Sequence, residues 1–132
     1  MTGPVLVFDG DCAFCTTSVR VLERWFPEGF RTVPYQWADL DRLGLTEREC
    51  SDRVQWIGDA QSPRTIRQSG SRAVCAVLRT GGAARGGLLG RTSAAVGLIA
   101  SVPPVSIVAE AVYLLVAANR HRLPGGTPAC RA

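Results

Sequence analysis

The stretch that decides the fold is residues 5–15, Val-Leu-Val-Phe-Asp-Gly-Asp-Cys-Ala-Phe-Cys. Its first four residues form a short, continuous apolar run, which predicts a strand buried on both faces. Asp9-Gly10 ends this run. Asp11 is placed to cap a following helix, because a carboxylate can accept the free backbone N–H groups of the first turn. The stretch therefore predicts a strand that leads directly into a helix, with two cysteines at the junction.

The helix expected after the junction carries one apolar stripe. Its members recur at helical spacing, at Cys15, Val19, Leu22 and Phe26. Arg20 and Arg24 fall on the other side of the same helix, and Pro27 ends it. This pattern predicts an amphipathic helix that packs on the first strand.

The sequence next predicts a strand over 31–37, in which Pro34 marks an edge or a bulge. A short helix is expected near the capping box Thr46–Glu49. A hairpin that pairs 54–57 with 64–68 follows, and then a helix from Gly70-Ser71. The resulting order, β-α-β-(α)-β-β-α, is typical of a small α/β layer fold. A length of 132 residues allows one core and leaves no room for two, so we expect a single domain over 1–132.

A helical extension is expected over about 88–122. The glycine-rich residues 81–90 read as a loop before it, and Pro103-Pro104 breaks it into two helices. A polar stripe marks the second helix, at Ser106, Glu110, Tyr113 and Arg120. Each piece is shorter than the ~20 residues of a membrane span. We therefore expect an amphipathic helix packed on the domain and no membrane association.

Composition excludes several classes of mechanism. The chain has 15 arginines, no lysine, one histidine and five cysteines, so it cannot form a Schiff base or use a phosphate-loop lysine. Its net charge is +4, but the arginines are dispersed and no base-stacking motif accompanies them, so nucleic acid is not an expected partner. The N-terminus lacks the basic region of an export signal, which predicts a cytoplasmic location.

The chemistry is expected at Cys12 and Cys15. Two cysteines separated by two residues at a helix N-terminus can close a small disulfide ring and exchange it with another disulfide. Cys12 is the expected nucleophile, because the free N–H groups and the macrodipole favour its thiolate. Cys15, one turn further and expected to be more buried, would resolve the mixed disulfide. Asp9 and Asp11 can either raise the pKa of a thiol or relay its proton, and the sequence leaves both roles open.

Several alternatives compete with this interpretation. The pair could be half of a zinc site or inert core thiols, but Cys50, Cys75, Cys130 and His121 are dispersed and no second Cys-x-x-Cys is present. Phosphoryl transfer at the Asp-x-Asp of the first strand lacks a lysine and a later acidic pair. A non-catalytic interaction module that docks through its C-terminal helices is the rival from another class. Cys75 and Cys50 are interpreted as bystanders.

The opening residues resemble the DCC family of predicted thiol-disulfide oxidoreductases, named for a D-x-x-C-x-x-C motif that Asp9, Cys12 and Cys15 match. Residues 70–73 are similar to a G-S-x-A motif found midway along the sequences of that family. The tail from Tyr113 to Cys130, with Asn119-Arg120-His121-Arg122, resembles its Y…N-R-x-R…G…C ending, although His121 replaces the usual aromatic residue.

The resemblance implies a thioredoxin-like fold and protein-disulfide reductase activity. The expected partners are a disulfide-containing protein or small disulfide and a cellular thiol reductant, with no metal or organic cofactor. One departure from thioredoxins is that Ser51-Asp52-Arg53 precedes the hairpin strand, where those proteins carry a cis-proline. Cys130 is a candidate third redox thiol because of its place in the tail motif.

Overall fold

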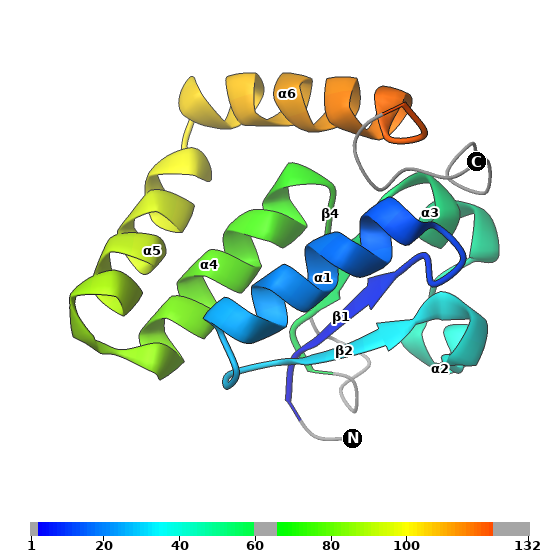
Figure 1. Ribbon diagram of the computed structural model, residues 1–132, viewed down its shortest axis with the longest axis horizontal. Coiled ribbons are helices and arrows are strands. Elements are labelled where there is room, and N and C mark those ends of the chain that lie inside the picture. The colour runs from blue at the N-terminus through cyan, green and yellow to red at the C-terminus, as the bar shows by residue number, and fades with distance from the viewer. Residues whose placement is uncertain (1–2, 60–65, 123–132) are drawn as a thin grey trace.

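The computed structural model describes residues 3–59 and 66–122 (Figure 1). The strands are β1 (Val5–Phe8), β2 (Arg31–Pro34), β3 (Gln55–Ile57) and β4 (Arg67–Ser69). The helices are α1 (Ala13–Trp25), α2 (Leu40–Leu43), α3 (Glu47–Asp52), α4 (Ser71–Arg85), α5 (Gly87–Ala100) and α6 (Val105–Asn119), with a 3-10 turn at Tyr35–Trp37. This mixed α/β architecture with C-terminal helices is consistent with a thioredoxin-like fold, as predicted.

The four strands form one mixed sheet in the order β2-β1-β3-β4. β1 pairs in parallel with β2 and antiparallel with β3, so it lies inside the sheet. β2 is an edge strand, as Pro34 predicted, since proline has no N–H to give to a second neighbour. The expected strand over 31–37 was too long, because the chain turns into the 3-10 helix directly after Pro34.

β1 builds both halves of the core because its side chains alternate between the two faces. Leu6 and Phe8 join the cluster under α1 and α4, together with Trp56 of β3. Val5 and Val7 join the cluster on the other face, which α2 and α3 cover (Figure 1). All four residues of β1 are buried, which is why the run carries no polar side chain.

The predicted capping box begins α3. The Thr46 hydroxyl accepts from the backbone N–H of Glu49 at 3.2 Å, and the Glu49 carboxylate accepts from the backbone N–H of Thr46 at 2.8 Å. These reciprocal bonds satisfy two of the donors that a helix N-terminus leaves open. They fix α3 beside β1, where Cys50 becomes part of the core.

The glycine-rich residues 81–90 do not form the predicted loop. They end α4 and begin α5, with only Gly86 between the two helices. A Cβ at Gly82 would lie 2.6 Å from the backbone oxygen of Gly90 and 2.9 Å from the backbone nitrogen of Ala94. The glycines therefore allow α4 and α5 to pack backbone against backbone, a role that composition alone cannot separate from flexibility.

α6 lies across the ends of α4 and α1, and the polar stripe predicted on it is confirmed (Figure 1). The stripe faces the domain: the Tyr113 hydroxyl accepts from the Val54 N–H at 3.0 Å, and Glu110 pairs with Arg53 at 2.6 Å. In the described part of the chain, no single helix is long and apolar enough to cross a membrane. α5 and α6 meet the length and composition requirements only as a pair bent by 96°.

Candidate active site

The loop between β1 and α1 is shaped by Asp9. Its buried carboxylate accepts from the Asp11 N–H and from the Gln36 side-chain amide, both at 3.0 Å. Gln36 in turn accepts from the Gly10 N–H at 3.0 Å. A Cβ at Gly10 would lie only 2.7 Å from the Cβ of Pro34. Asp9, Gly10 and Gln36 therefore lock the turn that presents the two cysteines, and Gln36 is a residue that sequence reasoning missed.

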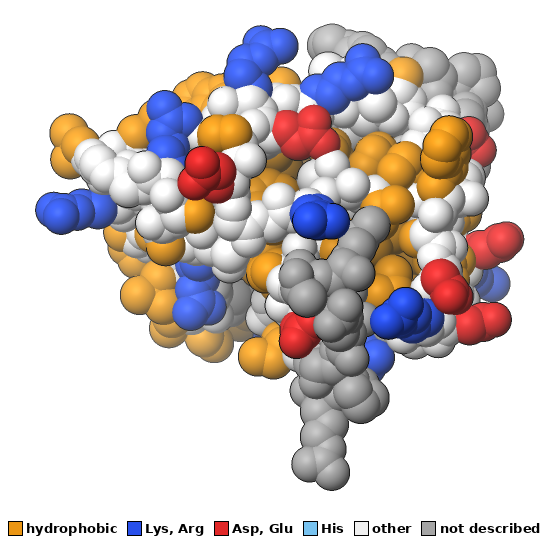
Figure 2. Space-filling view, turned by 90° about the horizontal axis from the view of Figure 1, so that it is seen from below, with side chains coloured by type: hydrophobic (Ala, Val, Ile, Leu, Met, Phe, Trp, Pro, Cys, Tyr) orange, Lys and Arg blue, Asp and Glu red, His pale blue; other side chains and the backbone are white. Residues whose placement is uncertain are grey.

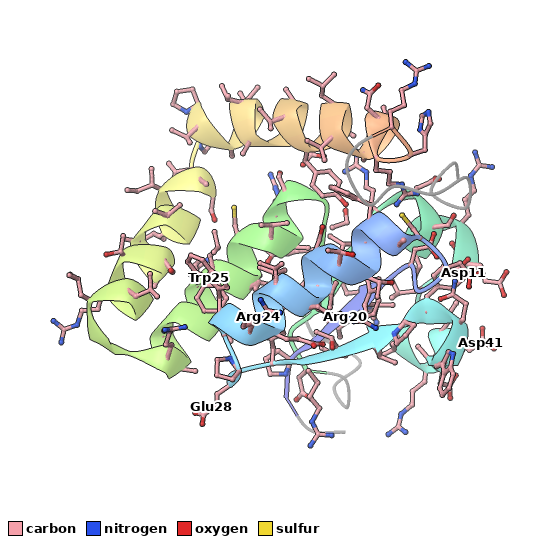
Figure 3. All side chains as sticks on the ribbon, in the orientation of Figure 1. Asp11, Arg20, Arg24, Trp25, Glu28 and Asp41 are labelled. Atoms are coloured by element: carbon pink, nitrogen blue, oxygen red, sulfur yellow. The ribbon has the colours of Figure 1, made fainter. Side chains whose placement is uncertain are left out.

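Cys12 itself is the N-cap residue of α1, not Asp11 as predicted. It has an extended backbone and makes no side-chain cap hydrogen bond, and its carbonyl accepts from the Thr16 N–H at 3.0 Å. Asp11 is exposed and lies before the first turn, whereas Arg20 and Arg24 project along the exposed side of α1 as expected (Figure 3). The N-cap lies one residue later than predicted because the Asp9 carboxylate accepts from the Asp11 N–H, which keeps Asp11 in the turn before the helix.

The two cysteines lie near the distance that a disulfide requires. Cys12 is fully buried, with 0% of its surface exposed, whereas Cys15 is half-buried. The expectation that Cys15 is the more buried thiol is therefore wrong: Cys15 points toward a cavity, described below. Cys15 carries a free thiol.

Arg120 is the charged partner of this thiol. Its Nη1 donates to Cys15 Sγ at 3.2 Å, and its Nη2 donates to the Ser51 carbonyl at 2.6 Å. The side chain reaches in from the residue that follows α6 and is only 6% exposed. In the sequence, Arg120 was a member of the polar stripe and of the tail motif, and neither pattern gave its partner. No spacing rule could place it beside a cysteine 105 positions away.

These surroundings set the acidity of Cys15. Burial raises the pKa of its thiol, Arg120 lowers it through both its charge and its hydrogen bond, and Asp9 raises it. The net pKa lies above the ordinary value. Arg120 thus offsets part of the cost of burying a thiolate, which is what an attacking or leaving sulfur requires.

The remaining polar stripe of α6 positions Arg120. The Glu110 carboxylate accepts from the Ser71 hydroxyl at 2.5 Å and from the Arg53 guanidinium at 2.6 Å, at the N-terminus of α4. Burial acts to raise the pKa of Glu110, but Ser71 and Arg53 lower it, and the net pKa is lowered. The carboxylate near a helix N-terminus is stabilised by the macrodipole. With the Tyr113 bond to Val54, it holds α6 in the register that delivers Arg120.

A cavity of about 240 Å³ lies beside these groups, enclosed by α1, α4, α6 and the sheet. Cys15, Asp9, Tyr113 and Arg120 are among the residues that bring polar atoms or sulfur to it, and the rest of the lining is mostly apolar, for example Phe14. A cavity of mainly apolar walls with few convergent polar groups is typical of a small-molecule or side-chain binding site. Cys15 lines this cavity, whereas Cys12 is not among its lining residues.

The other cysteines differ in their surroundings. Cys50 is buried in the core at the inner wall of the cavity, and its pKa is raised to about 11, by burial and then by Glu49. Cys75 is buried on α4, as predicted. Cys130 lies outside the described residues, and its predicted redox role stays a prediction. Over 3–59 and 66–122, no three His, Cys, Asp or Glu side chains gather in an arrangement that could hold a metal ion.

A Cys-x-x-Cys pair at the start of the helix that follows the first strand is the arrangement of proteins that exchange thiols and disulfides. Residues 6–126 match the family described as DCC1-like thiol-disulfide oxidoreductase, and the chain belongs to that family. This confirms the resemblance drawn from the motifs. A search of curated proteins found no match, and a search of solved structures found none.

Proposed function

We propose that this protein reduces disulfides with the Cys12–Cys15 pair, Cys12 acting as nucleophile and Cys15 as resolving thiol. The observation that carries the proposal is the contact between Cys15 Sγ and the Arg120 guanidinium at 3.2 Å, at the edge of a cavity. Arg120 also donates to the Ser51 carbonyl, but its other terminal nitrogen is directed at the thiol. Beside a thiol that must become a thiolate, it lowers the barrier to exchange.

In the first step, the Cys12 thiolate attacks one sulfur of the substrate disulfide. A bond forms between Cys12 and that sulfur, the substrate S–S bond breaks, and the second substrate sulfur leaves as a thiolate that takes up a proton. The position of Cys12 at the N-cap of α1 favours its thiolate, because the open N–H groups and the macrodipole are directed toward it.

In the second step, the Cys15 thiolate attacks Cys12. A Cys12–Cys15 disulfide forms, and the remaining half of the substrate leaves as a thiol. Asp9, which shares the cavity with Cys15, is the nearby carboxylate proposed to accept the Cys15 proton. Asp11 is exposed and is assigned no direct step.

A cellular thiol reductant then returns two electrons to the Cys12–Cys15 disulfide, so the cycle needs no metal or organic cofactor. The proposed substrate is a disulfide-containing protein or a small disulfide. The proposed location is the cytoplasm, because a reductase requires a compartment that keeps its thiols reduced.

The test measures reduction of insulin by the full-length protein with a thiol reductant. Cys12→Ser is expected to abolish activity, and Cys15→Ser is expected to accumulate a mixed disulfide between Cys12 and substrate, detected by intact mass. Cys75→Ala, at a buried thiol outside the cavity, is the control and is expected to retain activity. A mixed disulfide trapped on Cys15 in the Cys12→Ser variant would reverse the two roles, and full activity in both variants would exclude the mechanism.

A further inference from the structure

The outward surface of α6 is apolar along its whole length. The exposed residues of this helix are Val105, Ile107, Val108, Ala111, Val112, Leu114, Leu115, Val116 and Ala118. Its polar residues are the ones turned toward the domain, where Glu110 and Tyr113 make their bonds. A surface helix of a water-soluble domain normally has the reverse arrangement. The outer face of α6 is therefore more apolar than an ordinary water-exposed helix surface.

The apolar surface continues over α5. Leu88, Val96, Leu98 and Ile99 are exposed there, and Val102 extends the surface toward α6. Exposed apolar patches of this extent mark a surface that binds a partner or a membrane. We call the exposed apolar residues of 88–116 the apolar face.

Positive charge flanks the apolar face. Residues 85–122 hold four arginines and one acid, a formal charge of +3, and three of these arginines, Arg85, Arg91 and Arg122, are exposed, whereas residues 1–70 hold eight arginines and ten acids, a formal charge of −2. The single acid, Glu110, is already paired with Arg53. Figure 2 views the side of the molecule opposite α6; there, acidic side chains gather at the end that carries α2, and the end of α5 shows mainly arginine and hydrophobic side chains.

The lengths of α5 and α6 decide whether these helices can cross a bilayer or only lie on its surface. α5 has 14 residues and α6 has 15, which at ~1.5 Å per residue gives roughly 22 Å, short of the ~30 Å hydrocarbon core. The 96° bend between α5 and α6 also argues against a single straight span. Helices of this kind lie in the interface plane, with arginine side chains reaching up to the headgroups.

We propose that the apolar face of α5 and α6 docks on the surface of an anionic lipid bilayer. The charge argues for lipid over a second copy of this protein, because two copies meeting at this face would bring together two regions of like charge. An anionic headgroup layer attracts the same region. This proposal departs from the expectation that membrane association is absent.

The experiment is co-sedimentation of the full-length protein with vesicles of phosphatidylcholine alone and with added phosphatidylglycerol. Binding is expected to require the anionic lipid and to weaken with salt. Ile107→Ser/Leu115→Ser removes two side chains that are 67% and 66% exposed on one side of α6, and should weaken partitioning roughly tenfold or more. Trp37→Ser/Ile66→Ser removes two apolar residues outside α5 and α6 that are at least as exposed, at 86% and 68%, and should leave binding unchanged.

A second variant guards against a folding defect. Arg91→Gln/Arg122→Gln changes two exposed arginines and keeps the apolar face; it should also weaken binding to anionic vesicles by roughly tenfold. Circular dichroism establishes that each variant is folded. The proposal is overturned if wild type does not bind anionic vesicles, or if the Trp37/Ile66 control loses as much binding as the α6 variant. A dimer in sedimentation equilibrium that Ile107→Ser/Leu115→Ser dissociates, without vesicle binding, would overturn it too and assign the face to a second copy.

Discussion

Arg120→Gln is the substitution that most sharply separates a working thiol from a structural one. Glutamine keeps much of the length and hydrogen-bonding capacity of arginine but removes its positive charge. The Nη1 atom of Arg120 lies 3.2 Å from Cys15 Sγ. Because the guanidinium lowers the pKa of this thiol against the effect of burial, its loss should raise that pKa further.

The size of the effect follows from the distance and the exposure. An opposite charge within ~4–6 Å lowers a pKa by about 1–3 units. Cys15 is only half-buried, so solvent screens part of the interaction and we expect an effect at the small end of this range. At a pH below both pKa values this reduces the thiolate fraction of Cys15 about tenfold.

The assay is the alkylation rate of Cys15 as a function of pH, measured by peptide mass spectrometry in a Cys12→Ser background so that each thiol is followed separately. Arg120→Gln should move the profile to higher pH and slow alkylation near neutrality about tenfold. Arg120→Lys should recover part of the rate because it restores the charge. Arg122→Gln, at an exposed neighbour, is the matched control. An unshifted profile in Arg120→Gln would refute the electrostatic role and leave Arg120 only its bond to Ser51.

Three further predictions concern other described contacts and the tail. Cys50, with its pKa raised to about 11, should be alkylated near neutral pH far more slowly than Cys15; equal rates would contradict its burial in the core. Glu110→Gln should lower the free energy of unfolding by about 1 kcal/mol, since the pair with Arg53 is partly solvent-screened. The pKa of Glu110 is lower in the folded protein than the ordinary value of 4.5. The difference in stability between wild type and Glu110→Gln should therefore be complete above pH 4.5 and vanish as the pH falls through the pKa of the folded state. A stability difference that persists in acid would indicate a packing effect instead. For Cys130, mass mapping after mild oxidation should reveal a disulfide that includes it, and finding only Cys12–Cys15 would end its assignment as a third redox thiol.

The junction of β1 and α1 could be predicted from sequence because its signals are local. The apolar run of β1, the spacing of Cys12 and Cys15, and the capping box at Thr46 each depend on residues close together in the sequence. The helical pieces of the extension were also predicted, because Pro103-Pro104 marks their boundary.

The rest depended on contacts between distant segments. Arg120 reaches Cys15 across 105 positions, and Gln36 reaches Asp9 across 27. A polar stripe on α6 predicts a helix of two faces, but its spacing is identical whether the polar face meets water or the domain. The usable signals were the polar stripe and the tail resemblance, which both included Arg120 without giving its partner. The role of Gly82 in helix packing was hidden for a similar reason, because a glycine-rich composition is common to loops and to close helix contacts.

The central claim is that Cys12 and Cys15 form a reversible two-electron couple. Its most direct test is the reduction potential of the pair, obtained by equilibrating the full-length protein with thiol–disulfide buffers and quantifying each cysteine by mass. The account predicts one two-electron transition, at or below about −200 mV as for a reductase, which Cys12→Ser and Cys15→Ser each remove. No transition in the wild-type protein, or a transition that survives Cys15→Ser, would contradict it.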